Sequence, residues 1–223
     1  MVQFELAKIG FVIQSERMNP NWAEENLQTI RTLMERSAIY RRALAPIMLL
    51  AGAIGVVAAA IGILWPLDTF LDFIALWFSA AVFAIVGALL IARRQAIKDK
   101  EVFWSPPTRR VAQAFLPSLL AGMFFGIFPA FWDASFEAAF FIALVWILFY
   151  GFALHTAGFF MPRGIKFLGW LFIACFCLLI YGDADERIFL ENKEYWLMGF
   201  FFGVLHLAYG AYLYLTEKRK NAA

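Results

Sequence analysis

Six long apolar segments constrain the fold of this chain more than any other feature of its sequence. They lie at about residues 43–65, 71–92, 111–132, 136–159, 165–182 and 195–215. Each is long enough, or nearly so, to cross about 30 Å of hydrocarbon as a helix that rises about 1.5 Å per residue. Lipid offers no partner to an exposed backbone amide, and the segments lack the alternation of barrel strands, so each is expected to be helical. The predicted fold is all-α: a polytopic membrane protein with a six-transmembrane-helix bundle.

The composition and the cysteines agree with this prediction. Hydrophobic residues make up 63% of the chain and charged residues 16%, whereas a soluble domain is about half apolar and about a quarter charged. These values exclude a disordered chain, a disulfide-rich secreted module and a coiled coil. Cys175 and Cys177 lie two positions apart in one apolar segment, so they point to different faces of a helix. We expect them to fill space rather than to form a metal site or a disulfide.

The chain before the first span divides into two regions. Residues 1–20 interrupt every apolar run before it reaches the length of a secretory signal, and they are expected to form a poorly ordered or peripheral extension. Residues 21–41 predict a cytoplasmic amphipathic helix, with Asn21 and Glu24 at the spacing of a capping box. Its apolar stripe consists of Leu27, Ile30, Met34 and Ala38. This helix either lies on lipid headgroups and the inner loops or docks a soluble partner or a second subunit.

The distribution of basic residues predicts the orientation of the bundle, which should cover residues 42–216 with a basic tail at 217–223. Seventeen of the nineteen Lys and Arg residues lie on the side that holds both termini, and Arg187 and Lys193 lie on the other. Cytoplasmic segments carry such an excess, so both termini are expected in the cytoplasm. Six basic residues beside the spans are expected to contact anionic lipid headgroups, at about 1 kcal/mol each: Arg93, Arg94, Arg109, Arg110, Arg163 and Lys166. A stretch held against the bilayer is not expected to bind nucleic acid.

Small residues predict where helices approach closely, and they raise the question of a repeat. Gly122 and Gly126, and likewise Gly199 and Gly203, have the spacing that lets helix backbones meet in lipid. The first two hairpins share the order Arg-Arg, Leu-Leu-Ala-Gly, Gly-Ile, and the third shares only Leu-His-x-Ala with the second. Either one hairpin is repeated three times, or the likeness arose by chance.

Polar groups within the spans are the main functional candidates, because each needs a partner or water. Asp72 and Glu137 lie in the first turns of the second and fourth spans. There they either favour the helix start or form an acidic mouth that binds ions. His155 and His206 lie deeper, in the fourth and sixth spans. The two histidines either ligate a haem, relay protons, or form hydrogen bonds between helices.

The sequence carries no motif of a familiar catalytic site. It lacks His-Glu-x-x-His, Gly-x-Ser-x-Gly and the glycine patterns that bind phosphates and dinucleotides. We therefore expect no enzymatic activity, no catalytic residue and no metal site, and no cofactor unless the two histidines hold haem.

Three stretches carry a family resemblance: ENLQTIRTLMERSAIYRRALAP at 25–46, SPPTRRVAQAFLPSLLAG at 105–122 and FYGFALHTAGFFMPRGIKFLGWLF at 149–172. Together they are similar to a group of uncharacterised bacterial six-span membrane proteins. The resemblance implies a bacterial inner-membrane protein with a short cytoplasmic helix before its spans. It implies no activity and assigns no role to the histidines.

These observations favour a non-enzymatic accessory, scaffold or signalling subunit, assembled as a homo-oligomer or within a larger membrane complex. The alternative is a small ion or solute transporter or channel built from repeated hairpins. A third hypothesis is a haem-binding redox subunit that uses His155 and His206. A polar cavity reaching mid-membrane would favour transport, and a dry, Phe-rich interior would count against it.

Overall fold

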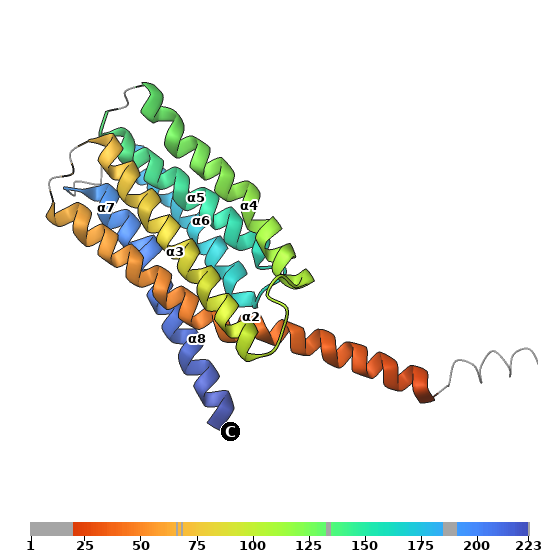
Figure 1. The fold of residues 1–223 in the computed structure, drawn as a ribbon. Helices are drawn as coiled ribbons and strands as arrows, with labels where there is room; N and C mark the ends of the chain where they lie inside the picture. Colours follow the sequence, from red (N-terminus) through yellow and green to blue (C-terminus); the bar gives the residue numbers. More distant parts are fainter. Residues whose placement is uncertain (1–19, 66, 68, 133–134, 185–190, 223) are drawn as a thin grey trace, which may run out of the picture. The chain divides into compact units, whose positions relative to one another are not determined.

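The computed structural model describes residues 20–65, 67, 69–132, 135–184 and 191–222. Of the predicted extension at 1–20, residues 1–19 therefore lie outside the described residues, and Pro20 begins a helix. Every regular element in these residues is helical (Figure 1). The elements in order are α2 (Pro20–Leu64), α3 (Phe70–Lys98), α4 (Pro106–Ile127), the 3-10 helix η1 (Phe128–Trp132), α5 (Ala138–Ala157), α6 (Arg163–Ala184), α7 (Lys193–Met198), the π-helix η2 (Gly199–Val204) and α8 (Leu205–Ala222).

Six segments of these helices are long and apolar enough to cross a membrane. They are Ala43–Leu64, Phe70–Lys98, Pro106–Phe131, Ala138–Ala157, Arg163–Tyr181 and Lys193–Thr216, the last made of α7, η2 and most of α8. This confirms the predicted all-α, multi-pass membrane architecture. Most bounds agree with the predicted ones within a few residues. The largest departure is at α3, which continues six residues past 92 because its basic end remains helical after the apolar run stops.

Contacts divide the chain into residues 1–38 and residues 39–223, and each unit is described by itself. The sequence predicted a separate helix at 21–41, but in the structure α2 continues without a break from Pro20 to Leu64. The physical reason is that no glycine occurs between Asn21 and Gly52, and the interior proline, Pro46, removes only one backbone donor. Among the predicted stripe residues, Leu27 has a described side chain, and it is exposed.

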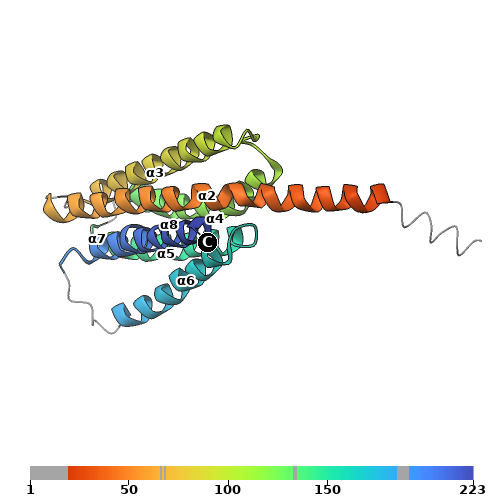
Figure 2. The ribbon, with the colours of Figure 1, turned by 90° about the horizontal axis from the view of Figure 1, so that it is seen from below.

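Within residues 39–223, α5 lies at the centre of the packing. It contacts α4, α6, α7 and α3 (Figures 1 and 2). Its sequence, AAFFIALVWILFYGFALHTA, is apolar on every face, which is the pattern of a helix surrounded by others. Ile147, Ala153 and Leu154 are fully buried on it.

The interior consists of two apolar clusters. The first lies toward the α2–α3 turn and includes Phe73, Trp77 and Tyr195, and the second lies toward the other end of the spans and includes Leu154 and Phe172. Among the residues whose side chains are described, the buried polar or charged ones are Glu194 and His206. The described interior is therefore mainly aromatic and aliphatic.

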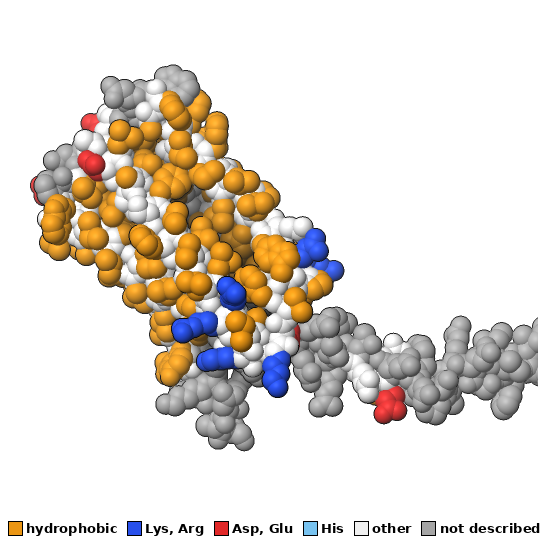
Figure 3. Space-filling view, viewed as in Figure 1, with side chains coloured by type: hydrophobic (Ala, Val, Ile, Leu, Met, Phe, Trp, Pro, Cys, Tyr) orange, Lys and Arg blue, Asp and Glu red, His pale blue; other side chains and the backbone are white. Residues whose placement is uncertain are grey.

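The surface of the 39–223 unit has a broad apolar band between two charged ends. In Figure 3, Lys and Arg side chains gather where α3 ends and α4 begins, and Asp and Glu side chains gather at the opposite end. Large apolar side chains are exposed between them, among them Phe83 on α3, Phe124 on α4 and Phe167 on α6. In water such a band would be costly, whereas in a bilayer it faces hydrocarbon.

Candidate functional site

The sixth span contains a π-helical turn, η2, next to the buried His206. We call this turn the break in the sixth span. In an α-helix the N–H of Leu205 would donate to the carbonyl of Phe201, four residues earlier. In η2 it donates instead to Phe200, five residues earlier. The carbonyl of Phe201 therefore loses its ordinary donor, and an unsatisfied carbonyl inside a membrane protein is costly. Such π-helical breaks in α-helices are often found at functional sites.

His206 supplies the missing donor. Its Nδ1 lies 2.9 Å from the carbonyl oxygen of Phe201, and its Nε2 lies 2.8 Å from the hydroxyl of Tyr150 on α5. A carbonyl only accepts, so Nδ1 carries the hydrogen, and in the neutral ring Nε2 accepts the Tyr150 hydroxyl proton. The imidazole thus joins the break in the sixth span to α5. We call Tyr150, Phe201 and His206 the histidine network.

Aromatic rings close around this network. The His206 ring is stacked on Phe202, with centroids 6.2 Å apart, and meets Phe172 of α6 edge-on at 6.0 Å. Tyr150 packs against the same two phenylalanines, at 5.0 Å from Phe202 and 5.4 Å from Phe172. His206 is only 1% exposed. The network is therefore enclosed by apolar groups and makes its hydrogen bonds within the protein.

Glycines of α2 bring the first span directly against the break. A Cβ on Gly55 would collide with the carbonyl group of Phe202, 2.6 Å from its carbon, and one on Gly52 would lie 2.6 Å from the amide nitrogen of Leu207. On the other side of this contact, a Cβ on Gly203 would lie 2.9 Å from the Val56 amide nitrogen. Of the predicted pair, Gly203 therefore lies at a close contact of helix backbones, and a Cβ on Gly199 would lie 2.6 Å from the Cβ of Ala59.

The other predicted pair, Gly122 and Gly126, has a different neighbour. A Cβ on Gly126 would lie 2.5 Å from the indole of Trp146, and the Trp146 Nε1 donates to the Gly122 carbonyl at 2.8 Å. The nearest atoms to a Cβ on Gly122 also belong to side chains, Phe149 and Trp146, at 3.5 and 3.6 Å. At this pair the nearest atoms of α5 belong to side chains, and the indole of Trp146 lies directly against Gly126.

The repeat predicted from the sequence equates Gly62 with Gly126, and these two glycines have different partners. Gly62 lies against the ring of Tyr195 in the sixth span, whereas Gly126 lies against its own hairpin partner. At this pair of positions the packing does not follow the proposed repeat.

His155 has different contacts from those of the histidine network. Its ring meets Trp170 at 5.1 Å and Phe159 at 5.5 Å, both edge-on, and its buried Nδ1 has no hydrogen-bond partner among the described residues. Gly169 of α6 packs on the backbone of His155, because a Cβ added to Gly169 would lie 2.6 Å from the His155 backbone nitrogen. The two histidines therefore have different aromatic neighbours.

The acidic candidates lie at helix starts. Asp72 completes a capping arrangement at the start of α3: its backbone N–H donates to the Thr69 hydroxyl oxygen at 3.1 Å, and that hydroxyl donates to the Asp72 carboxylate at 2.6 Å. Glu137 precedes α5, is exposed and forms no side-chain cap. A third acid, Glu194 in the first turn of α7, is 5% exposed, and its Oε1 has no described hydrogen-bond partner.

The basic candidates lie in the charged end of the surface. Arg93, Arg94, Arg109, Arg110 and Arg163 are all exposed. Lys166 is half-buried, and its ammonium lies 3.9 Å from the centre of the Phe159 ring. Cations over aromatic faces at the ends of spans are typical of the membrane interface.

A haem held by both histidines would need one free nitrogen on each imidazole, and both His206 nitrogens have protein partners. Among the described residues no three His, Cys, Asp or Glu side chains are grouped to hold a metal ion. Cys175 and Cys177 are free thiols.

Sequence reasoning found His206 and missed its partners. Tyr150 was the available signal, because a tyrosine hydroxyl in mid-span also needs a partner. No signal indicated the one-residue shift at Phe201. Comparison with protein-family models, curated proteins and solved structures finds no match for this chain.

Proposed function

We propose that this multi-pass membrane protein is a non-catalytic accessory, scaffold or signalling subunit of a bacterial inner-membrane assembly. The observation that carries the proposal is its apolar interior. Buried polar side chains among the described residues are Glu194 and His206, and the hydrogen bonds of His206 are made within the protein. A transporter needs groups that exchange with water along its path. The family resemblance supports the bacterial inner membrane as the location.

The charge distribution supports an orientation with both termini in the cytoplasm. The end of the bundle at which Lys and Arg gather (Figure 3) joins α3 to α4 and α5 to α6, and the positive-inside rule places such an end in the cytoplasm. To test this, single cysteines replace Lys98 or Thr69 in a chain whose own cysteines are changed to alanine. An impermeant thiol reagent added outside spheroplasts should label Thr69→Cys and not Lys98→Cys. The reverse labelling would contradict the orientation.

The part of α2 that precedes the first span, residues 20–42, is the proposed contact with a partner. Its apolar stripe is tested with Leu27→Asp together with Met34→Asp, and the matched control adds the same charge off the stripe, with Gln28→Asp together with Thr32→Asp. We expect the unmodified chain from gently solubilised membranes to migrate on native gels as a complex with its partner. The stripe variant should migrate without the partner, and the control variant should remain in the complex. Equal assembly of both variants would contradict this contact, and circular dichroism verifies that the spans remain helical.

Purified protein distinguishes the proposal from the transporter and redox hypotheses. In proteoliposomes, proton and cation fluxes should equal those of empty vesicles. A flux lost in Asp72→Asn or Glu137→Gln would overturn the proposal in favour of transport. The visible spectrum should contain no Soret band, and a stoichiometric band lost in His155→Ala would instead favour a redox subunit.

A further inference from the structure

Glu194 is an acidic side chain buried at one end of the bundle. It lies in the first turn of α7, and the next residue, Tyr195, donates its hydroxyl at 3.3 Å to the carbonyl of Leu67 in the α2–α3 turn (Figure 1). Glu194 is only 5% exposed, and its Oε1 has no hydrogen-bond partner among the described residues. An ionised carboxylate buried without a partner is far more costly than the neutral acid. This carboxyl group therefore needs either a cation beside it or a proton on it.

Few basic side chains occur near this end of the bundle. Residues 43–92 and 111–162 contain no Lys or Arg, so the spans packed around α7 supply no cation here. Lys193 adjoins Glu194 in α7, but its ammonium lies 4.0 Å from the centre of the Phe140 ring of α5. The other basic residue on this side, Arg187, lies outside the described residues. In the described part of the chain, the basic side chain next to Glu194 is thus held on an aromatic ring.

The other titratable side chains described at this end are acids and tyrosines. Glu137 and Glu191 are exposed to solvent, and so is Tyr181. The Asp72 carboxylate belongs to the cap of α3, and the Tyr195 hydroxyl donates to a backbone carbonyl. None of these groups carries a positive charge, so none can balance an ionised carboxylate. The described surroundings of Glu194 therefore favour a bound proton over a counter-ion.

The two neighbours of Glu194 in the sequence both contact the start of α5. The Lys193 ammonium lies over Phe140, and the Tyr195 ring packs against Phe136 with the centroids 6.4 Å apart. Phe140 and Tyr195 are themselves buried. The burial of Glu194 therefore depends on the contact of α7 with α5. A negative charge on its carboxyl would favour a turn that is exposed to water, and so would oppose this contact.

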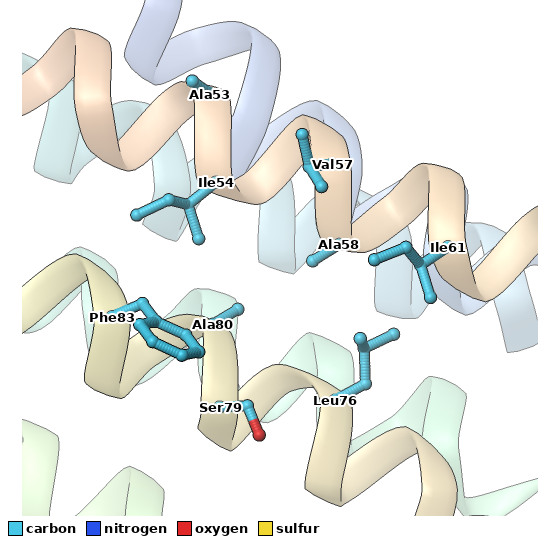
Figure 4. Close-up of a pocket in the computed structure, with 9 residues that line it drawn as sticks. All are labelled: Ala53, Ile54, Val57, Ala58, Ile61, Leu76, Ser79, Ala80 and Phe83. Atoms are coloured by element: carbon cyan, nitrogen blue, oxygen red, sulfur yellow. The ribbon is translucent and has the colours of Figure 1, made fainter.

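The described interior beyond Glu194 offers no chain of polar groups across the bundle. In the space between α2 and α3 (Figure 4), the lining side chains are apolar except that of Ser79, whose hydroxyl donates to the Ala75 carbonyl of its own helix at 2.6 Å. Along the sixth span, the next buried polar side chain described is that of His206. It lies twelve residues further on, which corresponds to about 18 Å along a helix axis. Glu194 is therefore placed to hold a proton at one end of the bundle and not to pass it across.

We propose that Glu194 is a proton-binding site, buried as the neutral acid, and that loss of its proton releases the first turn of α7 from α5. The site itself is independent of the scaffold function. With the orientation proposed above, it exchanges its proton with the outside of the cell, so the contact of α7 with α5 responds to external acidity. The tests below use purified protein and do not depend on that orientation.

The first test detects the neutral acid directly. Dicyclohexylcarbodiimide is an apolar reagent that consumes the proton of a carboxylic acid as it forms an acylurea, so it modifies buried neutral acids in preference to exposed carboxylates. The full chain in detergent micelles is treated at neutral pH, and adducts are mapped by mass spectrometry. Glu194 should carry about tenfold more adduct than the exposed Glu137 and Glu191. Equal labelling of the three acids would overturn the proposal.

The second test measures how the proton is coupled to folding. As the pH rises above about 4, where an exposed glutamate titrates, the unfolded chain releases a proton that the folded chain retains, so thermal stability should fall. Glu194→Gln should lack this fall and melt about 3 °C higher than the unmodified chain at neutral pH. Glu137→Gln, which changes an exposed acid at the start of α5, is the matched control and should keep the fall. The same pH dependence in Glu194→Gln and in the unmodified chain would refute the site.

Two further variants distinguish a bound proton from a counter-ion. If Lys193 or Arg187 kept the carboxyl ionised, its replacement by glutamine would turn an unreactive Glu194 into a reactive one. Under the proposal, carbodiimide labelling of Glu194 in Lys193→Gln and in Arg187→Gln should stay within about twofold of that in the unmodified chain. Labelling that appears only in one of these variants would overturn the proposal and assign Glu194 to an ion pair.

Discussion

The Nδ1 atom of His206 lies 2.9 Å from the carbonyl oxygen of Phe201, five residues earlier in the same span. This bond replaces the backbone donor that the π-helical turn removes, because Leu205 donates to Phe200 instead. The same imidazole accepts from Tyr150 on α5. One side chain therefore compensates the break in the sixth span and ties that span to the centre of the bundle.

His206→Leu is expected to lower the free energy of unfolding by about 2 kcal/mol, because the Phe201 carbonyl and the Tyr150 hydroxyl both lose their partner. His206→Asn should lose only about half as much, since its amide N–H can reach the position of Nδ1. Reversible unfolding in mixed micelles, followed by circular dichroism, measures both values. Equal losses in the two variants would show that the donor to Phe201 contributes little.

Tyr150→Phe removes the other half of the histidine network and should cost about 1 kcal/mol. Its effect should disappear in the His206→Leu background, because the hydroxyl then has no imidazole to bind. A double-mutant cycle on the same unfolding measurement gives the coupling. Additive losses would mean that the 2.8 Å contact between Tyr150 and His206 is not stabilising.

Gly55→Ala is expected to destabilise the bundle by about 2 kcal/mol, because its Cβ would collide with the backbone of Phe202. Gly122→Ala is the matched control, since it makes the same change inside a helix. Its Cβ would meet only Phe149 and Trp146 at ordinary contact distance, so we expect a change within about 0.5 kcal/mol. Thermal unfolding in detergent compares them, and a Gly122→Ala loss as large as that of Gly55→Ala would contradict the proposed backbone contact.

The sequence was sufficient to predict the six spans because each depends on a local property, about twenty apolar residues in a row. The position of Asp72 in the first turn of α3 is local in the same sense, whereas Asn21, the predicted cap, lies inside α2, which begins at Pro20. The contacts of Gly203 and Gly126 are not, because the same four-residue glycine spacing admits a backbone in one case and an indole in the other. The one-residue shift at Phe201 lies next to the contact with α2, and no sequence pattern indicated the shift.

Thr69→Ala should weaken the start of α3 by about 1 kcal/mol, because the hydroxyl both accepts from the Asp72 amide and donates to its carboxylate. Thr69→Ser keeps both bonds and should restore most of the stability. Hydrogen exchange of the first turn of α3 measures the effect locally. If Asp72→Asn changed an ion flux while Thr69→Ala left the helix start unaffected, the acid would have to be assigned to a mouth rather than to a cap.

Gly126→Ala is expected to cost about 2 kcal/mol on its own, because the added methyl group would lie 2.5 Å from the indole of Trp146. Trp146→Phe should cost about 1 kcal/mol, because it removes the N–H that donates to the Gly122 carbonyl. The double variant should be more stable than the sum of the two losses predicts, since the smaller phenyl ring vacates the space that the methyl group needs. Unfolding of the four proteins in one detergent gives the coupling between the two positions. A coupling of zero would mean that the Trp146 indole does not lie against Gly126. A different contact would then hold α4 against α5.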